Sequence, residues 1–161
     1  MASTSSQELL PLLKRKDWES KFASKLKRVH GRYAKRAFHR LMRKSSSLRS
    51  SLKKRSREYE VDFKMELYEV RQMLYASYAN PCRYCKTQLV VSNMACDHII
   101  AISNGGASIP ENLEMVCKTC NTRKGPLDGP DYTRLVKWVN KQPSYMTKYI
   151  NKKMAAKDIF R

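Results

Sequence analysis

A short stretch of the chain gathers residue types that can hold a metal ion and move a proton. Asp97 and His98 are adjacent, Asn112 follows fourteen residues after His98, and Asn121 nine after that. Carboxylate and amide oxygens are ligands that hard cations such as Mg²⁺ and Mn²⁺ prefer. A neutral imidazole near such a cation can take a proton from water. A side-chain amide can hold that imidazole in one orientation.

Each of these residues also has a purely structural interpretation. A lone histidine such as His98 is more often a hydrogen-bonded core residue than a base. Asn112 could cap a turn, and Asn121 could support a neighbouring cysteine turn through its side chain. The Gly105-Gly106 pair could be only a turn. The set taken together, at these spacings, favours the chemical interpretation.

Four of the five cysteines form two tight pairs, Cys82-x2-Cys85 and Cys117-x2-Cys120, with 31 residues between them. Two such turns supply the four thiolates of a tetrahedral structural zinc site, which is closed and has no position for water. Disulfides are the alternative, and we disfavour them because the chain does not resemble a secreted protein. The leftover Cys96 is expected to face inward as a small buried residue.

Short elements must position these residues. The segment 88–100, QLVVSNMACDHII, predicts two short strands around a turn at Ser92-Asn93. The segment 104–116 is interpreted as a loop, and a helix is expected to begin near Cys117–Asn121. A further helix after Asp128 and a last, basic helix from Pro143-Ser144 complete the prediction.

The N-terminal half predicts helices. Apolar residues recur every three or four positions, which predicts one helix that runs through Gly31 at a cost of up to ~1 kcal/mol relative to alanine. They are Trp18, Phe22, Leu26, Val29, Tyr33, Ala37 and Leu41. A second stripe, from Phe63 to Tyr78, predicts a connecting helix within residues 58–80. Residues 44–57, KSSSLRSSLKKRSR, lose this period and are interpreted as a linker, and residues 1–13 as a flexible leader.

The charge of the chain is concentrated at one end. Lysine and arginine outnumber aspartate and glutamate 33 to 14, and residues 1–57 hold 18 of the basic groups against 3 acidic ones. Nucleic acid is the expected partner of so basic a segment, ahead of a merely solvated surface or an anionic membrane. The candidate contacts are Lys27, Arg28, Arg32, Lys35, Arg36, Arg40, Lys53, Lys54 and Arg55, with Arg123 and Lys124 beside the polar set.

Composition also weighs against other classes. No run of apolar residues approaches the ~18 needed for a membrane span. The N-terminus lacks the basic-then-apolar order of a secretory signal, so we expect an intracellular location, cytoplasmic or nuclear or nucleoid.

The combination of Asp97-His98, Gly105-Gly106, Asn112 and CKTCNTRKG from Cys117 to Gly125 resembles the signature of the HNH endonucleases. The two cysteine pairs resemble the zinc-braced subset of that family, and the resemblance covers residues 81–124. It implies an α+β fold in which a small ββα-metal module carries a four-cysteine zinc site. A basic helical extension would precede this module, and short helices would follow it.

The resemblance also implies the roles of the site residues. His98 would be the general base that activates water, oriented by a hydrogen bond from Asn112. Asp97 and Asn121 would hold a catalytic Mg²⁺ or Mn²⁺. Asparagine stands at Asn121 where many members have histidine, which leaves the metal preference open. The implied reaction is hydrolysis of DNA phosphodiester bonds, by nicking or double-strand cleavage, to 5′-phosphate and 3′-hydroxyl ends.

We therefore expect three parts: a nucleic-acid-binding extension and linker over residues 1–57, a connecting helix over 58–80, and a nuclease domain over 81–161. The alternative is a non-catalytic, zinc-braced protein that binds nucleic acid. RNA as the substrate, the sequence preference, the oligomeric state and the biological role stay open.

Overall fold

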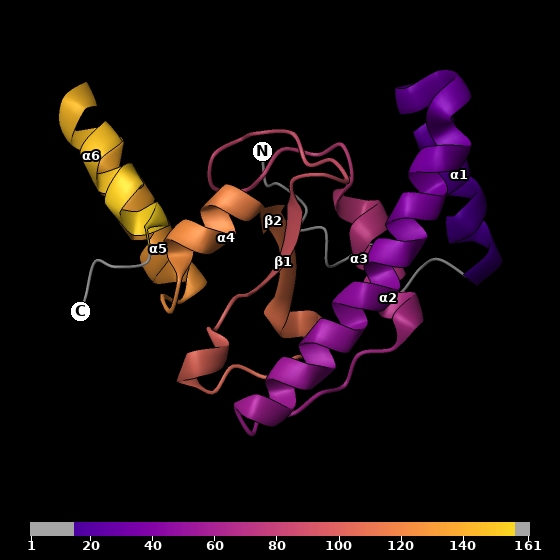
Figure 1. Ribbon diagram of the computed structural model, residues 1–161, viewed down its shortest axis with the longest axis horizontal. Coiled ribbons are helices and arrows are strands. Elements are labelled where there is room, and N and C mark those ends of the chain that lie inside the picture. The colour runs from indigo at the N-terminus through magenta and orange to yellow at the C-terminus, as the bar shows by residue number, and fades with distance from the viewer. Residues whose placement is uncertain (1–14, 157–161) are drawn as a thin grey trace, which may run out of the picture.

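The computed structural model describes residues 15–156, so the leader expected at residues 1–13 lies outside the described part of the chain. Figure 1 shows a β-hairpin at the centre, with the helices that precede it in the chain on one side and the helices that follow it on the other. The elements are α1 (Arg15–His30), α2 (Ala34–Glu58), α3 (Leu67–Ser77), β1 (Met94–His98), β2 (Leu113–Cys117), α4 (Lys118–Lys124), α5 (Gly129–Val139) and α6 (Ser144–Ala155). Single 3-10 turns lie at η2 (Gly31–Tyr33), η3 (Ile102–Asn104) and η4 (Pro110–Asn112).

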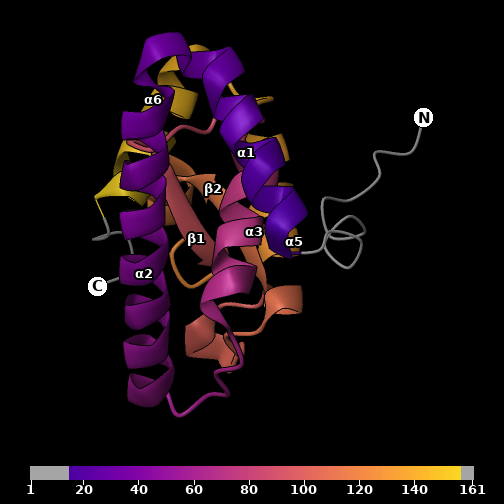
Figure 2. The same ribbon diagram turned by 90° about the vertical axis from the view of Figure 1, so that its right-hand side faces the viewer.

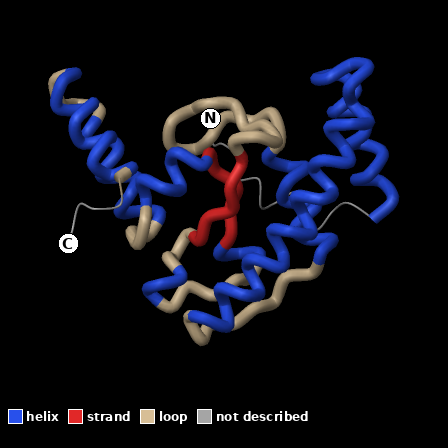
Figure 3. Tube along the Cα trace, viewed as in Figure 1, coloured by secondary structure: helices blue, strands red, loops and turns tan. Residues whose placement is uncertain are grey.

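The sheet consists of β1 and β2 paired antiparallel, from Met94 opposite Cys117 to His98 opposite Leu113 (Figure 3). The predicted partner strand before the Ser92-Asn93 turn is wrong, because residues 88–91 form only an isolated bridge between Gln88 and Pro81. The true partner is β2, which lies in the predicted loop. Together with α4, the two strands form the ββα unit that the α+β prediction requires.

The N-terminal stripe is divided between two helices. Gly31 takes a left-handed backbone (φ +52°) and begins η2, which separates α1 from α2, so the expectation of one continuous helix is wrong. Glycine adopts this conformation without the steric cost that a Cβ imposes. The apolar stripe predicted that Val29 and Tyr33 are buried, but they are 42% and 55% exposed.

The predicted linker at residues 44–57 is also wrong, because α2 continues through it to Glu58. Its buried side includes Leu52 and two serines, Ser45 and Ser56. The Ser45 hydroxyl donates a hydrogen bond to the Met42 carbonyl, 2.6 Å away on the preceding turn. These serines therefore belong to the packed face of the helix and do not interrupt it.

The connecting helix is shorter than predicted. α3 begins at Leu67, where the Glu66 and Glu69 side chains form a reciprocal capping box. Residues 59–66 are not helical, and within them Phe63 forms a parallel bridge with Ser108 of the loop between the strands.

One hydrophobic core joins the helices to the hairpin. It includes Phe22 and Leu26 of α1, Leu41 of α2, and Met94 and Val116 of the strands. Figure 2 shows α1, α2 and α3 lying together over one side of the hairpin. Within residues 15–156 no helix is long and apolar enough to cross a membrane.

We predict that Leu41→Ala destabilises the helices and the hairpin together, by about 2–5 kcal/mol, because this fully buried side chain belongs to the shared core. Thermal unfolding followed by far-ultraviolet circular dichroism and by zinc release should give one coincident transition at lower temperature. Val29→Ala, at a half-exposed position of α1, is the control. Two separate transitions would show that the helices and the hairpin are independent units.

Candidate active site

The sulfur atoms of Cys82, Cys85, Cys117 and Cys120 converge on one point, all within 4.8 Å of one another. Zinc–sulfur bonds of about 2.3 Å place the sulfurs of a tetrahedral site about 3.8 Å apart. The Cys120 thiol and nearby backbone N–H groups donate hydrogen bonds that lower the pKa of Cys82 to about 4, which favours the thiolate that a metal needs. The cluster fits a structural zinc, as the spacing predicts.

The cluster also sets where α4 begins. Cys117 is both the last residue of β2 and the N-cap of α4, and its sulfur accepts a hydrogen bond from the Cys120 backbone N–H. A metal held by the four sulfurs would therefore fix the strand end and the helix start at the same point. The fifth cysteine, Cys96, is buried on β1 as expected.

Asp97 and Lys124 form a buried ion pair across the β1–α4 contact. Lys124 Nζ lies 3.1 Å from Asp97 Oδ1 and donates a second hydrogen bond to the His98 backbone carbonyl at 2.8 Å. Lys124 is 1% exposed, so its predicted contact with nucleic acid is wrong. Its charge compensates the buried carboxylate.

The second oxygen of Asp97 is the feature that suits a cation. Asp97 Oδ2 is buried and makes no hydrogen bond with any described residue. Burial raises the pKa of this carboxyl to about 6, against the lowering effect of the Lys124 charge. Asn121 lies one turn before Lys124 on α4, and residues three apart are neighbours on a helix surface. Asn121 thus lies beside the part of α4 that reaches Asp97.

His98 is the last residue of β1 and is buried, 3% exposed. Its Nε2 atom lies 2.9 Å from the Ser108 hydroxyl. Burial, together with the nearby charges of Arg55 and Lys124, lowers the pKa of His98 to about 4. The imidazole is therefore neutral near pH 7, which is the form that can accept a proton.

The expected hydrogen bond from the Asn112 amide to the His98 ring is wrong. Asn112 Oδ1 accepts from the Ile100 backbone N–H at 2.8 Å, and its Nδ2 donates to the carbonyls of Ile100 and Ala107. Asn112 therefore braces the two ends of the loop that follows His98. Gly106 lies in the same loop and leaves no room for a side chain, because a Cβ there would come within 1.9 Å of the Ile100 carbonyl oxygen.

Comparison with known proteins agrees with this geometry. The family model of the HNH endonuclease matches residues 82–127, from the first cysteine of the cluster to just beyond α4. Residues 82–127 therefore match the HNH endonuclease family, and we call them the HNH domain. No curated protein matches the chain significantly.

Sequence reasoning missed three residues of the HNH site. Ser108, fully buried, contacts His98, and Ser56 of α2 donates a hydrogen bond to Ser108 at 2.7 Å. Glu114 lies directly opposite Asp97 in the strand register, and its carboxylate is held by Arg83 and Tyr84 of the first cysteine turn. Isolated serines carry no sequence signal for such contacts. Glu114 could have been placed opposite Asp97 if β2 had been recognised as the partner strand of β1.

The predicted basic contacts outside the HNH domain are accessible. All nine arm residues named from the sequence are exposed: Lys27, Arg28, Arg32, Lys35, Arg36, Arg40, Lys53, Lys54 and Arg55. Arg55 lies close enough to His98 for its charge to lower the pKa of that histidine. Within the domain, Arg123 is half-buried, and its Nε atom has no hydrogen-bond partner among the described residues.

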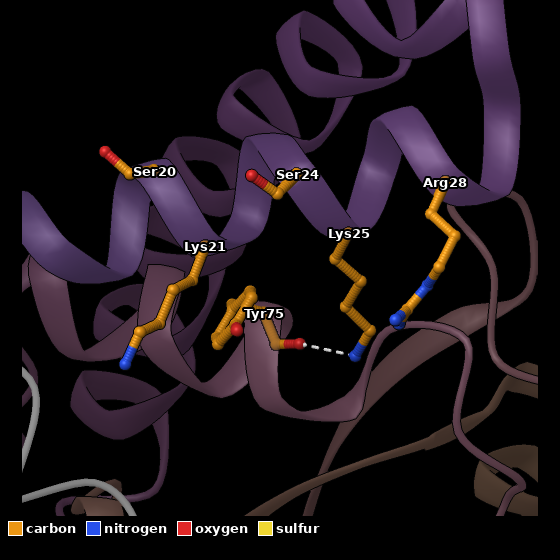
Figure 4. Close-up of a pocket in the computed structure, with 6 residues that line it drawn as sticks. All are labelled: Ser20, Lys21, Ser24, Lys25, Arg28 and Tyr75. Carbon is orange, nitrogen blue, oxygen red and sulfur yellow. Dashed lines mark hydrogen bonds between the residues drawn. The ribbon is translucent and has the colours of Figure 1, made fainter.

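A hollow of about 540 Å³ lies on α1 and is lined by basic and hydroxyl groups. Figure 4 shows Lys21, Lys25 and Arg28 extending from α1 toward Tyr75 of α3. Burial and the adjacent Arg28 charge lower the pKa of Lys25, so an anion placed there would relieve this repulsion. Ser20 and Ser24 add hydroxyl donors suited to phosphate oxygens.

We predict that Cys82→Ser removes zinc and lowers the melting temperature of the HNH domain, because Cys82 is fully buried and offers one of four convergent ligands. Loss of a structural metal typically unfolds small modules of this kind. Zinc content by atomic absorption and thermal unfolding measure the effect. Cys96→Ala should keep its zinc, and an unchanged zinc content in Cys82→Ser would remove this residue from the site.

Proposed function

We propose that the protein is a metal-dependent endonuclease that hydrolyses phosphodiester bonds in DNA. The observation that carries the proposal is the unpartnered, buried Asp97 Oδ2 within an HNH domain. Leaving a buried carboxylate oxygen without a hydrogen bond is costly, and a bound divalent cation would remove that cost. Asp97 and Asn121 would hold Mg²⁺ or Mn²⁺, which when bound stabilises the negative charge that develops as the phosphodiester is cleaved.

The remaining roles in the proposed reaction belong to His98, Arg55 and Asn112. His98 is neutral near pH 7, so its ring would take the proton from the attacking water. Arg55 is exposed on α2 close enough to His98 to affect it electrostatically, and would bind the phosphate. Asn112 keeps the loop between His98 and Ser108 in place.

The basic surface of α1 and α2 would bind the nucleic acid. Its exposed lysines and arginines suit phosphate contacts, which are largely independent of sequence. Burial and the nearby charge of Lys118 of α4 lower the pKa of Lys44 on α2. An anion between α2 and α4 would satisfy both groups.

One observation favours the alternative, a non-catalytic zinc-braced module that binds nucleic acid. Lys124 already neutralises Asp97, and both Asp97 and His98 are less than 10% exposed. The two functions differ in whether the bound nucleic acid is cut.

The deciding experiment is cleavage of a supercoiled plasmid in the presence of Mg²⁺ or Mn²⁺. We expect metal-dependent nicking or linearisation that His98→Ala reduces by at least 100-fold, while His39→Ala, at an exposed position of α2, retains it. Tight binding without cleavage across metals and across DNA and RNA would favour the binding module. Equal cleavage by both variants would remove His98 from the chemistry.

We predict that Asn121→Ala raises the Mn²⁺ concentration required for half-maximal cleavage by about tenfold or more, because it removes one of two proposed oxygen ligands. Calorimetric titration of Mn²⁺ into the zinc-loaded protein measures the same loss without cleavage. Asn140→Ala, at an exposed position after α5, is the control. Identical titrations for the wild type and Asn121→Ala would exclude Asn121 as a ligand.

We predict that replacing Lys35, Arg36 and Arg40 together by glutamine weakens DNA binding and flattens its salt dependence by about 2–3 units of log–log slope. Point substitutions are sharper than deletion of residues 1–57, because deletion would also remove Leu26, Leu41 and other core residues. Arg134→Gln is the control, since Arg134 already pairs with Asp131. An unchanged slope would place the DNA elsewhere.

A further inference from the structure

Helix α6 presents two tyrosines and two lysines to the solvent. Tyr145 and Tyr149 are 70% and 62% exposed, and Lys148 and Lys152 are exposed as well. Residues three and four apart are neighbours on a helix surface, so these four side chains lie on one side of α6. We call them the α6 face.

The opposite side of α6 anchors the helix to the rest of the protein. Met146, Ile150 and Met154 are half-buried there, and Met154 packs against the hydrophobic core. The Thr147 hydroxyl donates a hydrogen bond to the Val139 carbonyl at the end of α5, 2.9 Å away. The α6 face is therefore the outer side of a helix whose orientation is fixed by its inner side.

The charge around the α6 face suits a polyanion. Residues 132–156 contain no acidic residue and six basic ones, which are Arg134, Lys137, Lys141, Lys148, Lys152 and Lys153. A second copy of the chain would bring an equally basic surface, and the two would repel. The ammonium of Lys153 lies 5.6 Å from the centroid of the Tyr149 ring, so a cation stands beside an accessible aromatic face.

The tyrosines favour an unpaired strand over a duplex. Unpaired bases can be splayed out and stacked on aromatic side chains, whereas the bases of a duplex are covered by their neighbours. Tyr145 and Tyr149 are four residues apart, about 6 Å along the helix axis. This rise exceeds the roughly 3.4 Å between stacked bases of one strand, so each ring would meet a separate, unstacked base.

We propose that the α6 face binds an unpaired strand of DNA, with bases stacked on Tyr145 and Tyr149 and phosphates beside Lys148 and Lys152. The choice of DNA rests on the proposed function, to which the α6 face adds a substrate class. In Figure 1, α6 and the basic helices α1 and α2 lie on opposite sides of the hairpin. The two surfaces would hold different parts of one substrate, in which an unpaired strand adjoins a duplex.

The test measures binding of the full-length, zinc-loaded protein to a fluorescent oligothymidine of about 15 nucleotides, without added Mg²⁺ or Mn²⁺. We expect Tyr145→Ala and Tyr149→Ala each to lower this affinity by about fivefold or more, the loss typical of one stacked base. Affinity for a duplex of the same length should change by less than about twofold, because backbone contacts dominate it.

Matched variants separate the ring from the rest of the side chain. Tyr145→Phe and Tyr149→Phe keep the aromatic face and should bind the oligothymidine like the wild type. Tyr33→Ala removes a tyrosine of similar exposure, 55%, on the far side of the hairpin and is the control. Photocrosslinking of a bromodeoxyuridine oligonucleotide to the wild type, mapped by mass spectrometry, should identify Tyr145 or Tyr149.

Wild-type affinity for oligothymidine in both alanine variants would overturn the proposal, as would crosslinks confined to other residues. Phenylalanine variants as weak as the alanine variants would show that the hydroxyls bind and the rings do not stack. Tighter binding of an RNA of matching sequence would overturn the assignment to DNA. Self-association that depends on the tyrosines, seen by sedimentation with DNA affinity unchanged, would assign the face to a second copy of the chain.

The proposed function fails by a different result. A protein that binds the unpaired strand through its tyrosines and cuts no nucleic acid would retain the α6 face and lose the endonuclease. A protein that cuts the plasmid while both alanine variants bind oligothymidine normally would lose only the α6 face.

Discussion

The convergence of four cysteine sulfurs is the constraint on which the rest of the HNH domain depends. A hairpin of two five-residue strands is only marginally stable alone in water. The cysteine cluster joins the turn before β1 to the end of β2 and to the first residue of α4. With these three points fixed, Asp97 on the strand and Lys124 on the helix meet across their contact, and Asn121 lies beside them.

Opposite charges inside the domain impose a second constraint. A buried carboxylate needs compensation, and Lys124 supplies it to one oxygen of Asp97 while leaving the other oxygen open. The same lysine holds the backbone of His98. Lys124 therefore compensates the buried charge, and the second carboxylate oxygen of Asp97 has no hydrogen-bond partner among the described residues.

The sequence predicted features whose chemistry depends on local spacing. Two Cys-x2-Cys turns aim sulfurs at a point wherever they occur, and α4 follows directly from the second turn. β2 was missed because helices cover both of its faces, so its burial does not alternate. The serines of α2 were interpreted as a linker because a small hydroxyl residue on a packed helix face looks like a loop residue in sequence. Whether a lysine such as Lys124 is buried depends on tertiary contacts, and neither its partner nor Ser108 could be inferred from spacing.

The shared core has a geometric consequence. α2, with 25 residues, is about 37 Å long, close to the roughly 34–36 Å of one turn of B-form DNA. Its C-terminal end carries Arg55 and Ser56 next to His98, and its N-terminal end lies beside α1. Because α2 shares its hydrophobic core with the hairpin, it cannot rotate relative to the hairpin, and the distance between the two is fixed. In the proposed endonuclease, the phosphates that α2 contacts would therefore stay at a constant distance from the bond that is cleaved.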